Sequence, residues 1–375
     1  MNETLDWLRR EVAAEGFSDC GIAPAIDSQG FSNLVQWIDH GFAGEMSYFA
    51  DRIDAYRHPS GVLPGAQTII VMTLPYPAMT PVRCEAGFGR VARYTMNSEG
   101  DLGRDYHDVI HPKLKRICRA ISQRWPDANA RGVVDTAPLL EREIAQLAGL
   151  GWRGKNTLLL NKTAGSYFLL ACVLVDISLP TDESHDGFHC GTCTACLDAC
   201  PTDAFEQPGV LNASRCINYL TIEHRGMPPE SLRHKMGDWW FGCDVCQEVC
   251  PWNRRPTRQT TQWSPRRNSN QQSIAQSGMD LIELFSMSPE TFRQRFRKTP
   301  MWRSKRRGLL RNAAIVLGNQ RCTDAIDALI GALNDEEPLV RAACVWALKQ
   351  MPSEETIAAL QQRKSIEHDE MVRNE

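Results

Sequence analysis

The chain is organised around two cysteine runs, CGTCTACLDACP at residues 190–201 and CDVCQEVCP at residues 243–251. The first has the C-x2-C-x2-C-x3-C-P spacing of bacterial ferredoxins, in which a short loop offers three thiolates to one iron–sulfur cube and cannot enclose the fourth corner. In two-cluster ferredoxins the cysteine before the proline ligates the other cluster. This logic predicts two 4Fe-4S clusters, one held by Cys190, Cys193, Cys196 and Cys250, the other by Cys200, Cys216, Cys243 and Cys246.

Zinc and disulfides explain these cysteines less well. Zinc sites prefer two C-x2-C pairs or mixed Cys/His sets, whereas both runs here end in Cys-Pro after a three-residue gap. Disulfides need an oxidising compartment, and the N-terminal MNETLDWL carries early acids and no long apolar run, so no signal peptide is expected. The other six cysteines stand among apolar residues and are expected to fill cores: Cys20, Cys84, Cys118, Cys172, Cys322 and Cys344.

The composition indicates an ordinary soluble protein of two or three domains, with 375 residues, 42% hydrophobic and 23% charged. No run of about 18 apolar residues occurs, so no membrane span is expected and a cytoplasmic location is predicted. The net charge is -3, yet residues 251–311 carry fourteen Lys and Arg against three acids. Such segregation favours a polyanionic partner; a solvated basic surface is the alternative.

Hydrophobic patterns divide the chain into three predicted parts. Residues 1–180 are expected to form an α/β (or α+β) domain, residues 181–260 a ferredoxin-like domain, and residues 261–375 a basic connection followed by helices. In the last part RNAAI at 311–315 returns as RAACV at 341–345, which suggests HEAT-like helix pairs, with a plain helical bundle as the alternative. The one G-x-G-x-x-G spacing, GLGWRG at 149–154, follows a predicted helix instead of a strand, and no P-loop motif occurs, so no dinucleotide or P-loop site is expected.

The elements expected in the first part are helices at 5–17, 31–38, 106–125 and 139–147, and strands at 67–74, 132–135, 157–160 and 167–177. Pro138 is expected in the first turn of the fourth helix. Between residues 251 and 277 the polar, Arg- and Gln-rich sequence predicts an extended connection.

A candidate active site follows the strand at 132–135. Asp135 ends that strand, where side chains of α/β sheets face the ligand crevice. A partly desolvated carboxyl group there can keep its proton near neutrality and act as a general acid; the alternative is a cap for the next helix. The loop GLGWRGKNT at 149–157 offers amides and a cation to a polar ligand, or forms only a turn.

At this point the chain resembles the epoxyqueuosine reductase family. The cysteine runs alone would fit many ferredoxin-like proteins, but their combination with the Asp135 and Gly-Trp blocks is specific. The motifs that carry the resemblance span nearly the whole chain: GEM at 44–46, LPG at 63–65, RDYH at 104–107, VDTAPLLER at 134–142, AGLGWRGK at 148–155, RCINYLTIE at 215–223, GCDVCQEVCPWN at 242–253 and RNAAIVLGN at 311–319. Residues 96–103 look like a small insertion in the pattern.

The resemblance implies reduction of epoxyqueuosine to queuosine in the anticodon loop of tRNA. It also implies cobalamin, bound base-off without a histidine and fed by the two 4Fe-4S clusters, with electrons from a flavodoxin- or ferredoxin-type donor or a chemical reductant. It makes Asp135 the proton donor. The cobalamin contacts it implies are Arg57, Asp135, Lys155, Asn156, Leu158, Asp244 and Val245. A monomer is expected.

With a tRNA substrate, the basic segment gains a role. Its cations can neutralise phosphates, and Trp302 and Phe296 are candidates to stack on unpaired bases. The predicted tRNA contacts are Arg293, Arg295, Arg297, Lys298, Arg303, Lys305, Arg306 and Arg307, with Arg311 beside them. Two alternatives are a cobalamin-dependent reductive dehalogenase, which usually carries a twin-arginine export signal and needs no basic face, and a non-enzymatic electron-transfer module.

Overall fold

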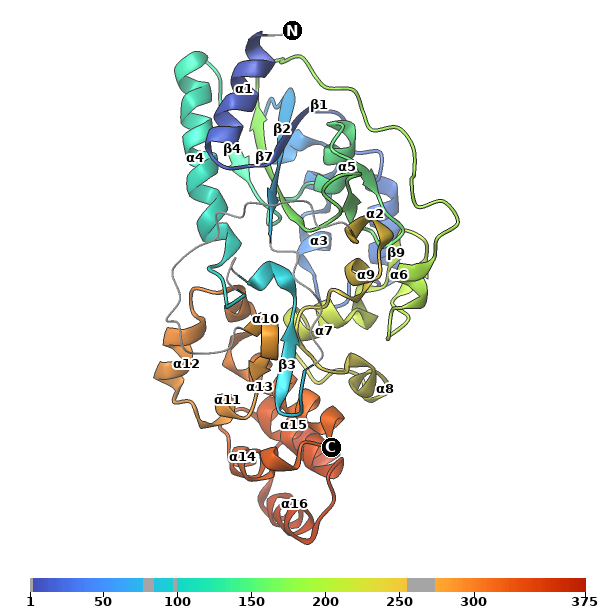
Figure 1. Cartoon of the computed structure of the whole chain (residues 1–375), viewed down its shortest axis with the longest axis vertical. Coiled ribbons are helices and arrows are strands. Elements are labelled where there is room, and N and C mark those ends of the chain that lie inside the picture. Colours follow the sequence, from blue (N-terminus) through green and yellow to red (C-terminus); the bar gives the residue numbers. More distant parts are fainter. Residues whose placement is uncertain (1–2, 77–83, 97–99, 255–273) are drawn as a thin grey trace.

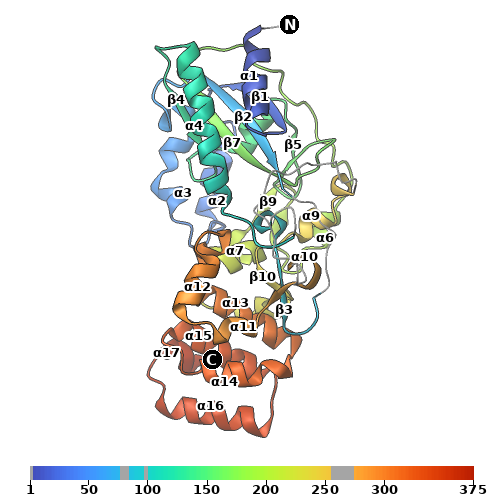
Figure 2. The ribbon, with the colours of Figure 1, turned by 60° about the vertical axis from the view of Figure 1, so that its left-hand side comes forward.

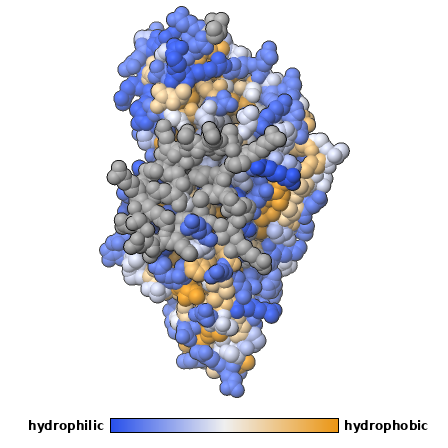
Figure 3. All heavy atoms as spheres, viewed as in Figure 1, coloured by the Kyte–Doolittle hydropathy of each residue, from blue (hydrophilic) through white to orange (hydrophobic). Residues whose placement is uncertain are grey.

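The computed structural model describes residues 3–76, 84–96, 100–254 and 274–375. The molecule is elongated, with a sheet domain at one end, a helical domain at the other and the cysteine region between them (Figure 1). In the described part of the chain, no helix combines the length and apolar character needed to cross a bilayer. The face drawn in Figure 3 is largely hydrophilic, with apolar residues in small groups between polar ones.

The N-terminal domain is built on a four-stranded sheet of order β1-β2-β7-β4, in which every neighbouring pair is antiparallel. Its strands are β1 (Asp19–Pro24), β2 (Thr68–Pro75), β7 (Phe168–Val175) and β4 (Ala130–Val133). β2 is buried along its whole length because helices cover both faces of the sheet. The architecture is therefore α+β, and the expectation of a ligand crevice at the ends of parallel strands does not apply.

Amphipathic helices cover the two faces. α1 (Glu3–Ala14) and α4 (Tyr106–Arg124) pack on one face through Leu8, Ile110 and their neighbours (Figure 2). α5 (Glu141–Leu147) packs on the other face. The predicted positions of α1, α4 and β2 are confirmed, because each carries a long, regular apolar pattern.

Three local predictions were wrong. The strand predicted at 132–135 is β4 (Ala130–Val133), so Asp135 lies in the turn after the strand and does not end it. Helix α5 begins at Glu141, with Leu140 as its N-cap residue, so Pro138 lies outside it. The predicted strand at 157–160 is only β6 (Leu159–Leu160), and it pairs with β5 (Trp152–Arg153) in a separate two-stranded ladder instead of joining the main sheet.

One strand from the first 180 residues leaves the N-terminal domain. β3 (Phe88–Val91) lies between β10 (Trp239–Phe241), to which it is parallel, and β11 (Met279–Asp280), to which it is antiparallel. The chain therefore crosses between the two ends of the molecule early, and the division at residue 180 does not separate two independent bodies. In the predicted insertion at 96–103, Met96 and Leu102 form a β-bridge; residues 97–99 lie outside the described part, as does most of the predicted connection at 251–277.

The cysteine region consists of short elements. α6 (Ala195–Asp198) and α9 (Val245–Glu248) follow the start of the two cysteine runs and contact each other. The remaining elements before the helical domain are α2 (Phe31–Asp39), α3 (Tyr48–Asp51), α7 (Ile217–Ile222), α8 (Glu230–Arg233), and the hairpin of β8 (Phe205–Gln207) and β9 (Val210–Leu211). The 3-10 turns are Ile53–Tyr56, Pro59–Gly61, Arg93–Thr95, Ala213–Arg215, His234–Met236, Pro251–Asn253, Pro300–Ser304 and Thr323–Ala325.

The C-terminal domain is helical, and the repeat predicted from sequence lies on its two central helices, α13 (Lys305–Gln320) and α15 (Pro338–Lys349). They pack closely at Gly318, where an added Cβ would stand 2.9 Å from the Cα of Ala347. The other helices are α10 (Ile274–Ser277), α11 (Glu283–Ser286), α12 (Pro289–Phe296), α14 (Ile326–Ala332), α16 (Glu354–Ile366) and α17 (Glu370–Asn374).

Candidate active site and cluster sites

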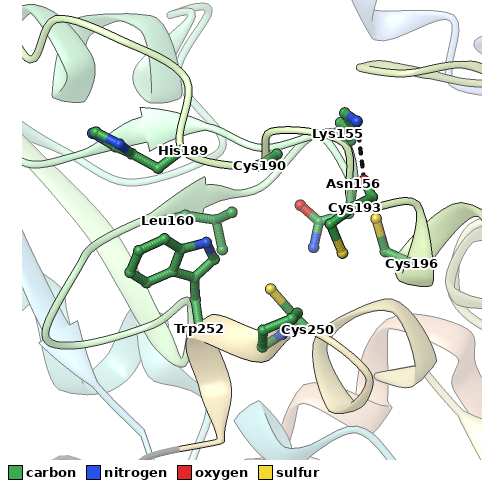
Figure 4. A pocket seen from close by; sticks show the side chains of 10 residues that line it. Lys155, Asn156, Leu160, His189, Cys190, Cys193, Cys196, Cys250 and Trp252 are labelled. Atoms are coloured by element: carbon green, nitrogen blue, oxygen red, sulfur yellow. Dashed lines mark hydrogen bonds between the residues drawn. The ribbon is translucent and has the colours of Figure 1, made fainter.

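The first predicted set of cysteines surrounds one cavity of about 230 Å³. Figure 4 shows the sulfur atoms of Cys193, Cys196 and Cys250 turned toward the same space. Cys250 belongs to the second run in the sequence, yet it faces the first. The cavity is lined by Cys190, Cys193, Cys196, Cys250, Lys155, Asn156, Leu160, His189, Pro251 and Trp252.

The second predicted set also comes together. Burial raises the pKa of the Cys243 and Cys246 thiols well above their ordinary value, and the neighbouring Cys216 adds to the shift in both. Burial also raises the pKa of Cys216, and Cys200 adds to that shift. The two sets are neighbours in space, because α6, which contains Cys196, and α9, which contains Cys246, contact each other.

The spacing of the thiols fits clusters better than single ions. Four thiolates around zinc lie about 2.3 Å from the metal and therefore converge closely. Within the described ranges, no three His, Cys, Asp or Glu side chains converge in the way one ion requires. A cavity walled by four cysteines is the arrangement that a cubane cluster needs.

Asp135 lies at the centre of a hydrogen-bonded group in the turn after β4. Its Oδ2 accepts a hydrogen bond from the hydroxyl of Tyr106 at 2.5 Å, and its Oδ1 lies 2.8 Å from Nε2 of His107. Helix α5 starts six residues later, and no cap hydrogen bond reaches it from Asp135. The alternative that Asp135 caps this helix is therefore wrong.

Two further groups complete the surroundings of His107. Asp105 caps α4 by accepting from the amide of His107 at 3.0 Å, and the same oxygen lies 2.8 Å from His107 Nδ1. Arg303, from the helical domain, places its Nη2 2.8 Å from the Tyr106 hydroxyl and 2.8 Å from His107 Nδ1. The group thus combines the start of α4, the turn after β4 and the turn before α13.

The electrostatics of this group correct one expectation. Burial alone would raise the pKa of Asp135, but hydrogen bonds from His107 and Tyr106 outweigh it, and the pKa lies below its ordinary value. Burial alone would lower the pKa of His107, but its hydrogen bonds to Asp105 and Asp135 raise that pKa to about 9. At neutral pH the proton is therefore on His107, and Asp135 is ionised.

A second carboxyl group near Asp135 was missed by the sequence analysis. Burial raises the pKa of Glu141 to about 7, and the charge of Asp135 adds to the shift. Glu141 is thus the nearby carboxyl group that can keep a proton near neutrality. It stands in the quoted VDTAPLLER motif, but only burial distinguishes it from an ordinary first-turn acid.

Most of the predicted cobalamin contacts lie on the side of the clusters. Lys155 donates to the carbonyl oxygens of Gly191 at 2.7 Å and Cys193 at 3.0 Å, and with Asn156 it lines the first cavity. Leu158 and Val245 are half-buried, and Arg57 is exposed, with its guanidinium 4.2 Å above the ring of Phe31.

Asp244 is fully enclosed. Its carboxylate accepts from the backbone amide of Arg93 at 2.7 Å and from the side chain of Gln247 at 2.9 Å. Its side chain therefore supports the protein around the second set of cysteines and does not face an open crevice.

The predicted tRNA contacts fall into three groups. Arg293, Arg297, Lys298, Lys305 and Arg307 are exposed. Arg295 pairs with Glu283 at 2.8 Å and Arg306 with Asp335 at 2.6 Å, while Arg303 lies in the group around Asp135.

Two residues named with them cannot serve in this way. Arg311 is 1% exposed and donates to the backbone oxygens of Leu220, His224 and Gly226, and Phe296 is completely buried. The expectations of a phosphate contact from Arg311 and of base stacking on Phe296 were therefore wrong.

Three segments match known protein families. Residues 57–136 match the family described as epoxyqueuosine reductase QueG, DUF1730, residues 189–253 match the 4Fe-4S double cluster binding domain, and residues 303–375 match HEAT repeats. The fold and the cysteine sets thus define an iron–sulfur oxidoreductase of the double-cluster type with a helical-repeat domain. Two 4Fe-4S clusters and the HEAT character of the last domain are confirmed at this level.

Relatives along the whole length give the particular family. The epoxyqueuosine reductase of Pseudomonas aeruginosa is 40% identical over 352 residues, which cover 92% of each chain, and that of Escherichia coli is 38% identical over 93% of this chain and 90% of its own. The crystal structure of an epoxyqueuosine reductase with an epoxyqueuosine-modified tRNA-Tyr stem loop matches with a TM-score of 0.83 and 26% identity, over 99% of this chain and 96% of that one. This chain belongs to the epoxyqueuosine reductase family.

Proposed function

We propose that this chain reduces epoxyqueuosine to queuosine in the anticodon loop of tRNA. The observation that carries the proposal is the hydrogen-bonded group of Asp135, His107 and Tyr106 in a molecule that also holds two sets of four cysteines. Iron–sulfur clusters deliver electrons one at a time. The hydrogen-bonded group around Asp135 holds a proton that can be given to the epoxide oxygen as its bond to carbon breaks. The reductive dehalogenase and the simple electron carrier are not favoured, because the full-length relatives are epoxyqueuosine reductases.

We infer that the two sets of cysteines ligate the clusters as predicted, and that cobalamin binds in the sheet domain. The residues present fit a cofactor without a histidine ligand, because the histidines beside the proposed contacts are bonded within the protein. His58 has Nε2 3.1 Å from the carbonyl oxygen of Ala25 and accepts at Nδ1 from the amide of Ser60, and both ring nitrogens of His107 face the carboxylates of Asp105 and Asp135. When bound and reduced, cobalamin would supply the redox chemistry that the epoxide requires. The residues proposed to contact it are Arg57, Asp135, Lys155, Asn156, Leu158 and Val245.

The protein's own contribution to the reaction is the proton. Loss of the epoxide oxygen as water consumes two electrons and two protons, and the departing alkoxide needs a positioned acid. The proton held by His107 passes along the 2.8 Å hydrogen bond to Asp135 and from there to the departing oxygen. Tyr106 holds the second carboxylate oxygen, and because burial raises its own pKa it stays protonated.

The second proton comes from water. The side chain of Asp135 is 38% exposed, so after the first transfer the group can be reprotonated from solvent. We propose that the exposed cations Arg293, Arg297, Lys298, Lys305 and Arg307 hold the tRNA while its anticodon loop reaches Asp135. The electron donor, the monomeric state and the cytoplasmic location predicted from the sequence stay predictions.

The proposal is tested with anaerobically reconstituted protein. Protein loaded with clusters and cobalamin is reduced with dithionite and given a tRNA stem loop that contains epoxyqueuosine, and the nucleosides are analysed by mass spectrometry. We expect queuosine, one oxygen atom lighter than the substrate, to form in the complete reaction and not without cobalamin. Unchanged epoxyqueuosine with fully loaded, reduced protein would overturn the proposed function, and failure to take up cobalamin would favour the electron-carrier alternative.

A further inference from the structure

We propose that Arg303 is a positioning residue for the proton donor: it orients Tyr106 and His107 against Asp135, so that the helical domain completes the active site of the sheet domain. This inference rests on the proposed function. It assigns to Arg303 a role different from the phosphate contact that the charge pattern predicts.

The hydrogen-bond directions carry the first step. A guanidinium group can only donate, so the Tyr106 hydroxyl, 2.8 Å from Arg303 Nη2, must accept there. The single hydroxyl hydrogen of Tyr106 is then free to point at Asp135 Oδ2, 2.5 Å away. The guanidinium carbon also lies 5.1 Å from the centre of the Tyr106 ring, so both the ring and its hydroxyl are held. Arg303 thereby fixes one of the two hydrogen bonds that orient the carboxylate.

The second step concerns His107, which is faced by charged groups from three elements. Asp105 at the start of α4 and Asp135 after β4 each place an oxygen 2.8 Å from one ring nitrogen and favour the charged imidazolium. His111 stands one turn further along α4, with ring centres 5.8 Å apart. Nη2 of Arg303 lies 2.8 Å from Nδ1 and 3.3 Å from Nε2, so its positive charge stands over the face of the imidazole ring and not on the line of either nitrogen's lone pair.

Arg303 and the two carboxylates therefore act on the charge of His107 in opposite directions. Asp105 and Asp135 stabilise the protonated ring, and the positive charge of Arg303 stabilises the neutral ring. The positive charge of Arg303 holds the pKa of His107 below the value that the two carboxylates alone would give. Release of the proton toward Asp135 is easier for that reason.

The backbone around Arg303 is fixed on both sides. Ser304 is buried and donates to the carbonyl oxygens of Thr221 at 3.0 Å and Ile222 at 3.3 Å. On the other side, the amide of Asp105 donates to the carbonyl oxygen of Lys298 at 2.8 Å, which joins the start of α4 to the segment just before the turn that contains Arg303. Arg303 is thus held where it contacts the active site, whereas Lys305 and Arg307, on the first turn of α13, are exposed.

The variants Arg303→Gln and Arg303→Lys test the role, with Arg307→Gln as the matched control on the same basic surface. Three quantities are measured on reconstituted protein: the single-turnover rate at saturating stem loop, the Kd of the stem loop, and the pKa of His107 from NMR of protein with labelled histidine, assigned with His107→Gln. Iron content shows that each variant has folded around its clusters.

For Arg303→Gln we expect a single-turnover rate about 10- to 100-fold lower, an unchanged Kd and a higher pKa of His107. Arg303→Lys keeps the charge and should bring the pKa of His107 back close to its wild-type value. The rate should stay low, because one ammonium group cannot reproduce the planar contact of the guanidinium. Arg307→Gln weakens binding and leaves the pKa of His107 in place.

A weaker Kd for Arg303→Gln, with unchanged saturated rate and unchanged pKa of His107, would overturn the inference and make Arg303 a phosphate contact. Failure of the proposed function is distinguishable from this outcome. In that case the wild-type protein does not convert the stem loop, while the pKa of His107 still reports whether Arg303 acts on it.

Discussion

At the scale of single residues, the sequence singles out Asp135 as the candidate proton donor, but it does not reveal where the proton of the group lies. Asp135 stands out in the sequence because a carboxyl group follows an apolar strand. Its ionisation depends on His107 and Tyr106, which lie 28 and 29 residues earlier in the chain and reach it only in the folded protein. The motif RDYH contains both partners, yet nothing in its spacing says that they face Asp135.

Replacement of Asp135 tests its place in the reaction. We expect Asp135→Asn to lower the rate of epoxide reduction by about 10²- to 10⁴-fold, because an amide can neither accept the proton from His107 nor pass it on. Cluster and cobalamin absorption spectra and stem-loop affinity should stay as in the wild type. Full turnover by this variant, combined with loss of activity in Glu141→Gln, would transfer the role of donor to Glu141.

The pH dependence follows from His107. Because its pKa is raised to about 9, the transferable proton is present below that pH and is lost above it. The single-turnover rate at saturating stem loop should therefore be flat from about pH 6 to about pH 8.5 and fall roughly tenfold per pH unit well above pH 9. His107→Gln should have a low rate at every pH and should not show the fall above pH 9. If the fall persists in His107→Gln, another group titrates there.

At the scale of elements, long regular patterns were predictable and short ones were not. α4 and α13 carry apolar residues over many turns, which local sequence reveals. β3 has only four residues, and its partners β10 and β11 lie about 150 and 190 residues further on. The local sequence therefore does not indicate that β3 pairs outside the N-terminal domain. The late start of α5 has a similar cause: the amide of Ala137 bonds to the carbonyl oxygen of Val134 and forms a turn that local preference at Pro138 does not reveal.

Helix α13 depends on a buried cation. The guanidinium of Arg311 donates to three backbone oxygens that belong to α7 and the segment after it, at 2.7 Å each. We expect Arg311→Met to destabilise the protein by about 2–4 kcal/mol, because these buried carbonyl groups lose their donor. Thermal unfolding should show a lower Tm than for Arg307→Met, an exposed arginine on the same helix. Equal Tm values for the two variants would contradict a structural role for Arg311.

At the scale of the whole molecule, each predicted set of cysteines combines residues from both cysteine runs and so joins distant parts of the chain. Cys250 lines the cavity of the first set although it belongs to the second run, and the two sets are neighbours through the contact of α6 with α9. The ferredoxin spacing made this grouping predictable, because the cysteine–proline endings specify the exchange. The antiparallel topology of the N-terminal sheet was not predictable from the sequence.

A single cysteine replacement tests the exchange. Cys250→Ala should lose the first cluster and keep the second, so that the iron content falls from about eight to about four per chain. Mössbauer and EPR spectra of the reduced variant should show one remaining 4Fe-4S cluster. Cys243→Ala is the matched variant for the second set. Loss of both clusters in Cys250→Ala together with retention of both in Cys243→Ala would contradict the predicted sets.

The basic surface tests whether the helical domain holds tRNA. Lys305 and Arg307 are exposed, whereas Arg306 between them forms an ion pair with Asp335, with Nη2 2.6 Å from Oδ2. Each of Lys305→Glu and Arg307→Glu should weaken stem-loop binding. Each should also make the negative slope of log K against log salt shallower by about one, because one phosphate contact and its released counterion are lost. Lys349→Glu makes the same charge change on an exposed residue outside the predicted surface and should leave the slope in place. If these three variants bind alike, net charge alone governs binding and α13 does not contact the phosphates. Arg306→Glu is a fourth variant, and if it alone makes the salt dependence weaker, the ion pair of Arg306 with Asp335 opens when tRNA binds.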